Sequence, residues 1–253
     1  MKWMRRIFIL IGVLTLIHQY IWYQRTPKIP AELIAPEKMT VWANSGGLPL
    51  TDTTLLASIE TLKKQYGARH IQLNVFYQED KWYASRAPKI TLNEVISTFP
   101  FLNYWLALAA DDTIGVKALA GLIRSRELER QIVFSSNNVA ILHYLQNVLP
   151  RIPQIIPPEE LERFMTYRKW LLLPFFHTAY DVALVPLDTT LEQGYLKPKF
   201  IRALGHLGIP VWVDSVENLS QVLWLADRKV KSVRMDRVDL ALLPRATLQP
   251  SLE

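Results

Sequence analysis

The chain has 253 residues, of which half are hydrophobic and 21% are charged, and this composition excludes a wholly disordered protein. Because the chain contains no cysteine, disulfide frameworks, thiolate metal sites and a cysteine nucleophile are excluded as well. The formal charge is +6, but Lys2, Arg5, Arg6 and Arg25 supply +4 of it, which leaves +2 (6 − 4) for the rest. That remainder has no basic run interleaved with aromatic residues, so we expect no nucleic-acid partner.

A membrane segment is predicted at the N-terminus. Residues 7–23 are mostly apolar, and as a helix they are about 25 Å long at ~1.5 Å per residue, the lower limit for a span. The basic flank predicts a cytoplasmic N-terminus, and the aromatic residues of 20–23 fit the far interface. We interpret residues 1–25 as an uncleaved signal anchor and 26–38 as a proline-containing linker, with a cleaved signal peptide as the alternative. Either interpretation predicts export; the anchor predicts a single-pass protein of the cell (inner) membrane with a periplasmic, extracytoplasmic domain.

Beyond the linker, short β-branched or apolar runs alternate with helical patterns. Strands are predicted over residues 39–43, 70–76, 104–109, 131–135, 152–156, 182–186, 211–214 and 230–235. Helices are predicted over 51–66, from about 91, and over 115–127, 139–148, 158–167, 197–207 and 216–226. Eight strands with intervening helices predict an α/β fold, a (β/α)8 TIM barrel over residues 39–245 with a tail at 246–253. A doubly wound open sheet is the alternative.

Three segments of this predicted barrel resemble the glycerophosphodiester phosphodiesterase family, within the phosphatidylinositol-phospholipase-C-like phosphodiesterase barrels. The first, residues 41–47, stands where that family has His-Arg-Gly. The second, residues 67–75, is similar to the family's Gly-Ala-x-x-Ile-Glu-Leu-Asp-Val. The third joins 206–214 to 235–239 and resembles the closing His-x-x-Gly, Val-x-Trp-Thr-Val and Thr-Asp-Arg-Pro-Asp. The resemblance covers roughly residues 39–242 and implies a TIM-barrel phosphodiesterase fold.

The sequence departs from this family at its functional positions. The family's acid/base histidine and phosphate-binding arginine align with Asn44 and Ser45, and its two metal-binding carboxylates align with Gln72 and Asn74. A carboxamide does not shuttle protons near neutral pH, and losing such a catalyst typically costs ~10²–10⁴ in rate. Amides also lack the negative charge that hard cations prefer in their ligands. Trp212 forms either a wall that binds glycerol or sugar or part of the core between barrel and helices. With the first interpretation, the predicted ligand-binding, degenerate site consists of Asn44, Ser45, Gln72, Asn74 and Trp212.

Two further family positions are also missing. A third carboxylate would fall within residues 106–109, where no acid occurs, and a second histidine within 83–86, where none occurs either. The joint loss of these groups indicates a barrel whose mouth has no ionisable catalytic group. We therefore expect no catalytic residue, no metal and no cofactor.

Three functions remain open at this point. The first is a membrane-anchored extracytoplasmic barrel that is catalytically inactive and binds a lipid-derived or polar small-molecule ligand or an envelope protein. The second is an active hydrolase of lipid headgroups or envelope polymers, whose relocated site would consist of His70, Asp80, Asp111 and Asp112. The third is a structural subunit of an envelope assembly that docks through the apolar segment 165–176.

Overall fold

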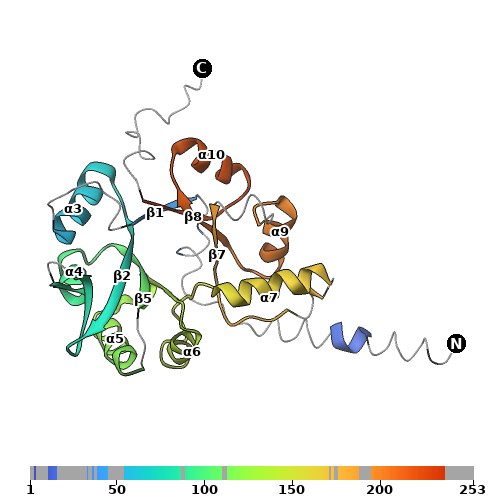
Figure 1. The fold of residues 1–253 in the computed structure, drawn as a ribbon, viewed down its shortest axis with the longest axis horizontal. Helices are drawn as coiled ribbons and strands as arrows, with labels where there is room; N and C mark the ends of the chain where they lie inside the picture. Colours follow the sequence, from blue (N-terminus) through green and yellow to red (C-terminus); the bar gives the residue numbers. More distant parts are fainter. Residues whose placement is uncertain are drawn as a thin grey trace, which may run out of the picture.

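Strands form the centre of the molecule and helices lie around them (Figure 1). The computed structural model describes residues 3, 11–15, 33, 36, 39–44, 54–86, 89–109, 113–170, 172–173, 176–187 and 195–236. The strands of the central ring are β1 (Thr40–Asn44), β2 (His70–Gln78), β5 (Asn103–Ala109), β6 (Ile132–Ser136), β7 (Ala183–Pro186), β8 (Val211–Val216) and β9 (Ser232–Met235).

These strands close into a parallel barrel. β1 pairs with β2 and β9, β2 with β5, β5 with β6, β7 with β8, and β8 with β9, all in parallel. Between β6 and β7 the ring is completed by single parallel bridges, from Phe134 to Gln154 and from Ile155 to Val182. The strands of the ring and this bridged segment make up the eight members of the predicted (β/α)8 barrel. An open doubly wound sheet would not return from β9 to β1, so that alternative is wrong.

Helices follow the strands and cover the outside of the barrel (Figure 1). They are α3 (Leu55–Tyr66), α4 (Leu92–Thr98), α5 (Thr113–Ser125), α6 (Val139–Val148), α7 (Pro158–Lys169), α9 (Pro198–His206) and α10 (Leu219–Asp227), with a 3₁₀ turn at Leu128–Arg130. Side-chain caps fix several helix starts: the Thr91 hydroxyl accepts a hydrogen bond from the Glu94 N–H. At the other end of α3, Gly67 adopts the left-handed conformation and donates its N–H to the Lys63 carbonyl.

Residues of the strands alternate between two hydrophobic cores. On β5, Tyr104, Leu106 and Leu108 face outward and pack in the large core between strands and helices. Trp105, on the opposite face, points into the barrel. The inner core consists of Leu33, Trp42, Trp105, Val133, Ile155, Val182 and Trp212, with Leu184 packed against it.

Three tryptophans fill the inside of the barrel. The ring centroids of Trp42 and Trp212 are 5.1 Å apart, those of Trp105 and Trp212 5.9 Å, and those of Trp42 and Trp105 6.3 Å. These separations are typical of aromatic pairs in contact. The interior of this barrel is therefore a packed aromatic core, on which the residues of the barrel mouth rest.

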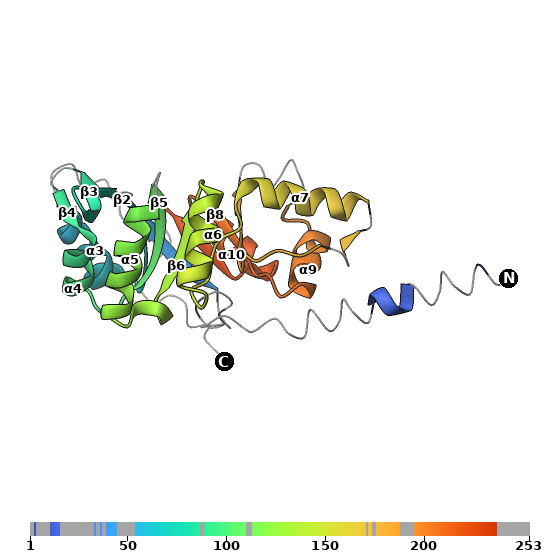
Figure 2. The same cartoon turned by 90° about the horizontal axis from the view of Figure 1, so that it is seen from below.

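One hairpin was not predicted from the sequence. β3 (Lys81–Arg86) pairs antiparallel with β2, and β4 (Lys89–Thr91) pairs antiparallel with β3, next to the end of β2 (Figure 2). The turn between β2 and β3 consists of Glu79 and Asp80, whose φ angles are 51° and 59°. Positive φ at both central residues is typical of the type I′ turn, which sequences usually signal with glycine. Neither position is a glycine, so the usual sequence signal was missing.

The predicted fifth strand, 152–156, is shorter than expected. Only Gln154 and Ile155 pair with neighbours, and each does so through an isolated bridge. Pro153 and Pro157 flank this pair. Proline has no N–H to donate, so a continuous ladder does not form here.

Most of the predicted membrane segment lies outside the described residues. Within it, residues 11–15 are described as helical, and Ile11, Val13 and Leu14 are exposed. In the part of the chain that the structure describes, no helix combines the length and hydropathy of a membrane span. The signal anchor, the linker and the tail therefore stay predictions.

Candidate functional site

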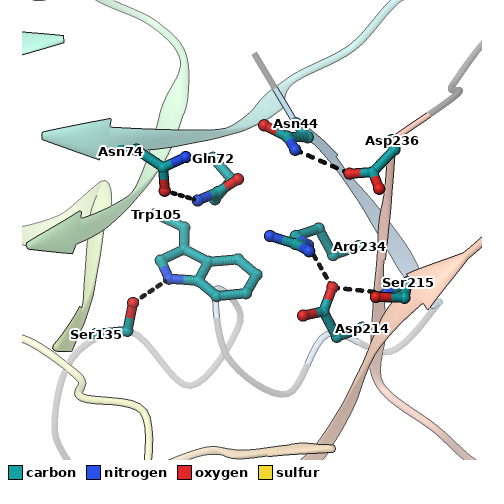
Figure 3. A network of polar contacts seen from close by, with 9 residues as sticks. All are labelled: Asn44, Gln72, Asn74, Trp105, Ser135, Asp214, Ser215, Arg234 and Asp236. Carbon is teal, nitrogen blue, oxygen red and sulfur yellow. Dashed lines mark hydrogen bonds and ion pairs between the residues drawn. The ribbon is translucent and has the colours of Figure 1, made fainter. Parts of the chain in front are cut away.

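Polar side chains gather where the parallel strands of the barrel end. Asn44 is the last residue of β1 and is in register with Gln72 of β2, while Asn74 is in register with Ala107 of β5. In TIM barrels the functional groups lie at the carboxyl ends of the strands. Three of the predicted site residues, Asn44, Gln72 and Asn74, thus lie together at the barrel mouth (Figure 3). Ser45 lies outside the described residues.

Gln72 and Asn74 form an amide pair at this mouth. The Gln72 Nε2 donates a hydrogen bond of 2.8 Å to the Asn74 Oδ1. Gln72 is only 1% exposed, whereas Asn74 is exposed. Among the described residues, none donates a hydrogen bond to the buried Gln72 Oε1. Leaving a buried acceptor without a donor typically costs about 1–3 kcal/mol, so this oxygen is suited to accept a hydrogen bond from a hydroxyl or from water.

The mouth also holds ionisable groups that the sequence analysis did not predict. Asp214 of β8 forms an ion pair with Arg234 of β9 through Oδ1 and Nε. The same Oδ1 accepts a hydrogen bond of 2.6 Å from the Ser215 N–H. Burial raises the pKa of the Asp214 carboxyl above its ordinary value, while the Arg234 charge and the Ser215 hydrogen bond act in the opposite direction. The mouth therefore contains an ion pair, in addition to the amides that stand at the family's catalytic positions.

A second carboxylate at the mouth contacts a predicted site residue. The Asn44 Nδ2 donates a hydrogen bond of 2.8 Å to the Asp236 Oδ1, which connects the end of β1 to the end of β9 (Figure 3). Both of these acids are thus already engaged, Asp214 by a guanidinium and Asp236 by an amide. Neither is paired with a histidine in the described part of the mouth.

A bulge in β8 places Asp214 and Ser215. The register between β8 and β9 shifts between Val213 and Val216, and Ser215 has a φ of 59°. A bulge of this kind re-aims side chains at the rim of a barrel. Here it brings the Ser215 N–H onto the Asp214 carboxylate, beside Arg234.

Trp105 forms the floor beneath these polar groups. Its Nε1 donates a hydrogen bond of 2.7 Å to the Ser135 Oγ, and the Arg234 guanidinium carbon lies 5.8 Å from its ring centroid. Trp212, which we expected to form a wall for a ligand, is 1% exposed and lies in the inner core below the mouth. Trp212 therefore supports the floor and presents almost no surface to solvent.

Of the four residues proposed for a relocated hydrolytic site, the two that the structure describes, His70 and Asp80, lie far apart. His70 begins β2, and Asp80 lies in the turn beyond its end, so roughly 26 Å of strand at ~3.3 Å per residue separates them. The His70 ring packs 5.0 Å from the Trp42 ring, and burial, followed by the Arg69 charge, lowers the His70 pKa to about 4. The ring is thus neutral at physiological pH. Asp111 and Asp112 lie outside the described residues.

The apolar segment 165–176 is exposed in part. Trp170, just after α7, is 68% exposed, and Leu172 is exposed too. In contrast, Phe176 is buried with its ring centroid 5.2 Å from that of Phe164. A docking role for the exposed residues of this segment stays a prediction.

The resemblance to phosphodiesterases implies a divalent cation at the mouth, and the described side chains there do not fit one. Gln72 and Asn74 offer uncharged amide oxygens, and the Asn74 Oδ1 already accepts a hydrogen bond. Hard cations bind most tightly to several carboxylates, whereas the Asp214 carboxylate is neutralised by Arg234. Within the described residues, no group of three or more His, Asp or Glu side chains is arranged to hold a metal ion. We derive no step through a metal.

Comparison with solved structures identifies the fold. A glycerophosphodiester phosphodiesterase from Parabacteroides distasonis matches with a TM-score of 0.61 and 12% identity, over 80% of this chain and 94% of that one. The glycerophosphodiester phosphodiesterase from Agrobacterium tumefaciens matches with a TM-score of 0.59 and 15% identity, over 81% and 97%. A phosphodiesterase from Oleispira antarctica, solved with its product sn-glycerol 3-phosphate, matches with a TM-score of 0.57 and 15% identity, over 80% and 94%.

The chain therefore has the fold of the glycerophosphodiester phosphodiesterases, as the sequence motifs predicted. No protein-family model matches the sequence. No curated protein matches it either.

Proposed function

We propose that this protein is a barrel of glycerophosphodiester phosphodiesterase fold that binds a polar, hydroxyl-bearing ligand at its mouth and does not hydrolyse phosphodiesters. The proposal is supported by the amides Asn44, Gln72 and Asn74 at the ends of β1 and β2. None of them moves a proton near neutral pH. The two carboxylates at the described mouth are engaged by Arg234 and Asn44.

The buried Gln72 Oε1 carries the binding half of this proposal. It is an acceptor with no protein donor among the described residues, next to the exposed Asn74. A ligand hydroxyl placed beside Gln72 would donate a hydrogen bond to its Oε1. The Arg234 guanidinium and the Trp105 ring lie at the same barrel mouth, near Gln72 (Figure 3). A small polyol or a glycerol-containing headgroup has the matching chemistry, with hydroxyl donors and an apolar face for the ring.

We expect the purified full-length protein to bind glycerophosphocholine without hydrolysing it. Calorimetry would measure binding, and release of free choline in the presence of calcium or magnesium would measure hydrolysis. The Agrobacterium tumefaciens enzyme, assayed in parallel, is the positive control for hydrolysis. Gln72→Leu should weaken binding about tenfold, the effect of losing one ligand hydrogen bond. It should leave the stability of the fold nearly unchanged, because removal of the unsatisfied buried acceptor offsets loss of the hydrogen bond to Asn74.

A matched control substitution distinguishes an effect at the barrel mouth from a general effect of removing an amide side chain. Asn147→Ala removes an exposed amide on α6, away from the mouth, and should leave binding unchanged. Choline release that disappears in Asn44→Ala would overturn the proposed inactivity. Equal binding by the parent protein and Gln72→Leu would overturn the proposed ligand position.

We also propose that residues 1–25 anchor this barrel in the cell (inner) membrane, with the barrel on the periplasmic side. The support is the apolar run 7–23 with its basic flank, together with the exposed apolar Ile11, Val13 and Leu14 of the helical residues 11–15. An apolar helix whose side chains face outward is suited to lipid.

Deletion of residues 2–25 is expected to keep the protein in the cytoplasm, because both the export signal and the anchor are lost. The full-length protein should resist alkaline extraction from membranes and should be digested by protease added to spheroplasts. Extraction of the full-length protein at alkaline pH would contradict the anchor, and full protection from protease would contradict the orientation.

A further inference from the structure

A pocket of about 330 Å³ lies at the end of the barrel opposite the mouth. It is formed by the C-terminal half of α9, the start of β8 and the turn between α10 and β9. Helices α9 and α10 are neighbours in both views (Figures 1 and 2). Ile201, Ile209 and Val211 line it with apolar surface, and Gly205 leaves it open on the α9 side. A volume of this size is typical of small-ligand sites, which hold about 300–1,000 Å³.

The rim of this pocket is basic. Arg202 and His206 reach it from α9, and Lys229 and Lys231 reach it from the turn before β9. Among the described residues that line the pocket, none is acidic. An apolar floor under several cationic groups is complementary to an amphiphile with an anionic headgroup, because acyl carbons contact the floor while the headgroup meets the cations.

The N-terminal part of the chain joins the barrel beside this pocket. The Lys231 Nζ donates a hydrogen bond of 3.3 Å to the Pro36 carbonyl, and the Thr40 N–H donates to the Lys231 carbonyl. The predicted membrane segment thus connects to the barrel at the same end as the pocket. A lipid is the amphiphile that an anchored protein meets at this end at high local concentration.

We propose that this pocket is a binding site for an anionic phospholipid. The Arg202 and Lys229 side chains contact the headgroup phosphate, and an acyl chain lies against Ile201 and the half-buried Pro210, beneath which Ile209 and Val211 are buried. The site is separate from the barrel mouth and does not depend on the ligand proposed there, whereas the choice of a lipid rests on the proposed membrane anchor.

The absence of cysteine from the chain makes a direct test possible. A Cβ added at Gly205 meets no atom within 4 Å, so Gly205→Cys carries a trifluoromethyl label, which is much smaller than an indole, to the pocket without a clash and without filling it. The full-length protein in phosphatidylcholine nanodiscs is titrated with dihexanoyl-phosphatidylglycerol, dihexanoyl-phosphatidylcholine or inorganic phosphate. We expect a saturable change in the fluorine NMR shift of the label with the phosphatidylglycerol and at least about tenfold weaker binding of the other two probes.

Matched variants identify the side chains that bind phosphatidylglycerol. Arg202→Gln combined with Lys229→Asn should weaken phosphatidylglycerol binding about 10- to 30-fold, since each cation near a lipid surface contributes ~1 kcal/mol. Lys117→Gln combined with Lys199→Gln removes the same charge from exposed positions outside the lining and should have little effect. Without any label, Gly205→Trp should fill the pocket and abolish binding in calorimetry, whereas Gly121→Trp, also at a position with open space, should not.

Several results would contradict the proposal of a phospholipid site in this pocket. If phosphatidylcholine binds as tightly as phosphatidylglycerol, the pocket is an apolar crevice that does not recognise the headgroup charge. If inorganic phosphate binds as tightly as phosphatidylglycerol, the pocket is an anion site that does not recognise the acyl chain. Retention of lipid binding in Gly205→Trp would place the lipid elsewhere. If the Lys117→Gln, Lys199→Gln control loses as much affinity for phosphatidylglycerol, the effect comes from the overall surface charge of the protein and not from this pocket.

Discussion

Replacing Trp42 by alanine is expected to lower the free energy of unfolding by about 3–5 kcal/mol, the range for removing a large aromatic side chain from a core. Trp42 is completely buried and contacts Trp212, Trp105 and His70. Neighbouring strands hold the backbone in place on both sides, so the barrel relaxes little into the cavity. Since whole domains are stable by only about 5–15 kcal/mol, this one change removes a large part of the total.

Urea unfolding, followed by far-UV circular dichroism, is the measurement. Trp170→Ala is the matched control, because Trp170 is 68% exposed and its loss should change stability by no more than about 0.5 kcal/mol. Similar losses from the two substitutions would mean that the interior tryptophans do not hold the barrel together.

Replacing Arg234 by methionine is expected to destabilise the protein by about 1–3 kcal/mol at neutral pH, because the Asp214 carboxylate then stays half-buried without its cation. Burial already raises the Asp214 pKa, and Arg234 is the group that chiefly opposes this rise. Without Arg234 the folded-state pKa rises further above the unfolded value. A folded-state pKa above the unfolded value means that stability falls as pH rises between the two values.

The loss in Arg234→Met should therefore be smaller at pH 5 than at pH 7, and equilibrium unfolding at the two values measures the difference. Arg234→Met combined with Asp214→Leu should recover most of the stability, since replacing a whole buried pair by apolar groups is often neutral. A loss in the single variant that does not change with pH would exclude the Asp214 carboxylate as its cause.

Strand positions were predictable from the sequence because β-branched and apolar residues alternate along each strand. The same alternation placed Gln72 and Asn74 on one face, and the structure brings this face to the barrel mouth with Asn44. Local patterns also marked helix starts such as the Thr91 cap. Those features depend on residues close in the sequence.

Features that depend on long-range register were not predictable from one sequence. The Asp214–Arg234 pair requires the β8–β9 register and its bulge, and the Asn44–Asp236 contact joins residues 192 positions apart. Trp212 was expected at a ligand wall because its strand was known but its depth in the barrel was not. The turn at Glu79 and Asp80 lacked the glycine that would have signalled the β2–β3 hairpin.

The three tryptophans inside the barrel, with ring centroids 5.1–6.3 Å apart, also have an optical consequence. Indole transitions at such short separations couple to one another, which gives a circular dichroism band that neither isolated nor solvent-exposed indoles produce. That band exists only while β1, β5 and β8 surround one common interior. It allows closure of the barrel to be followed separately from the helices that cover it.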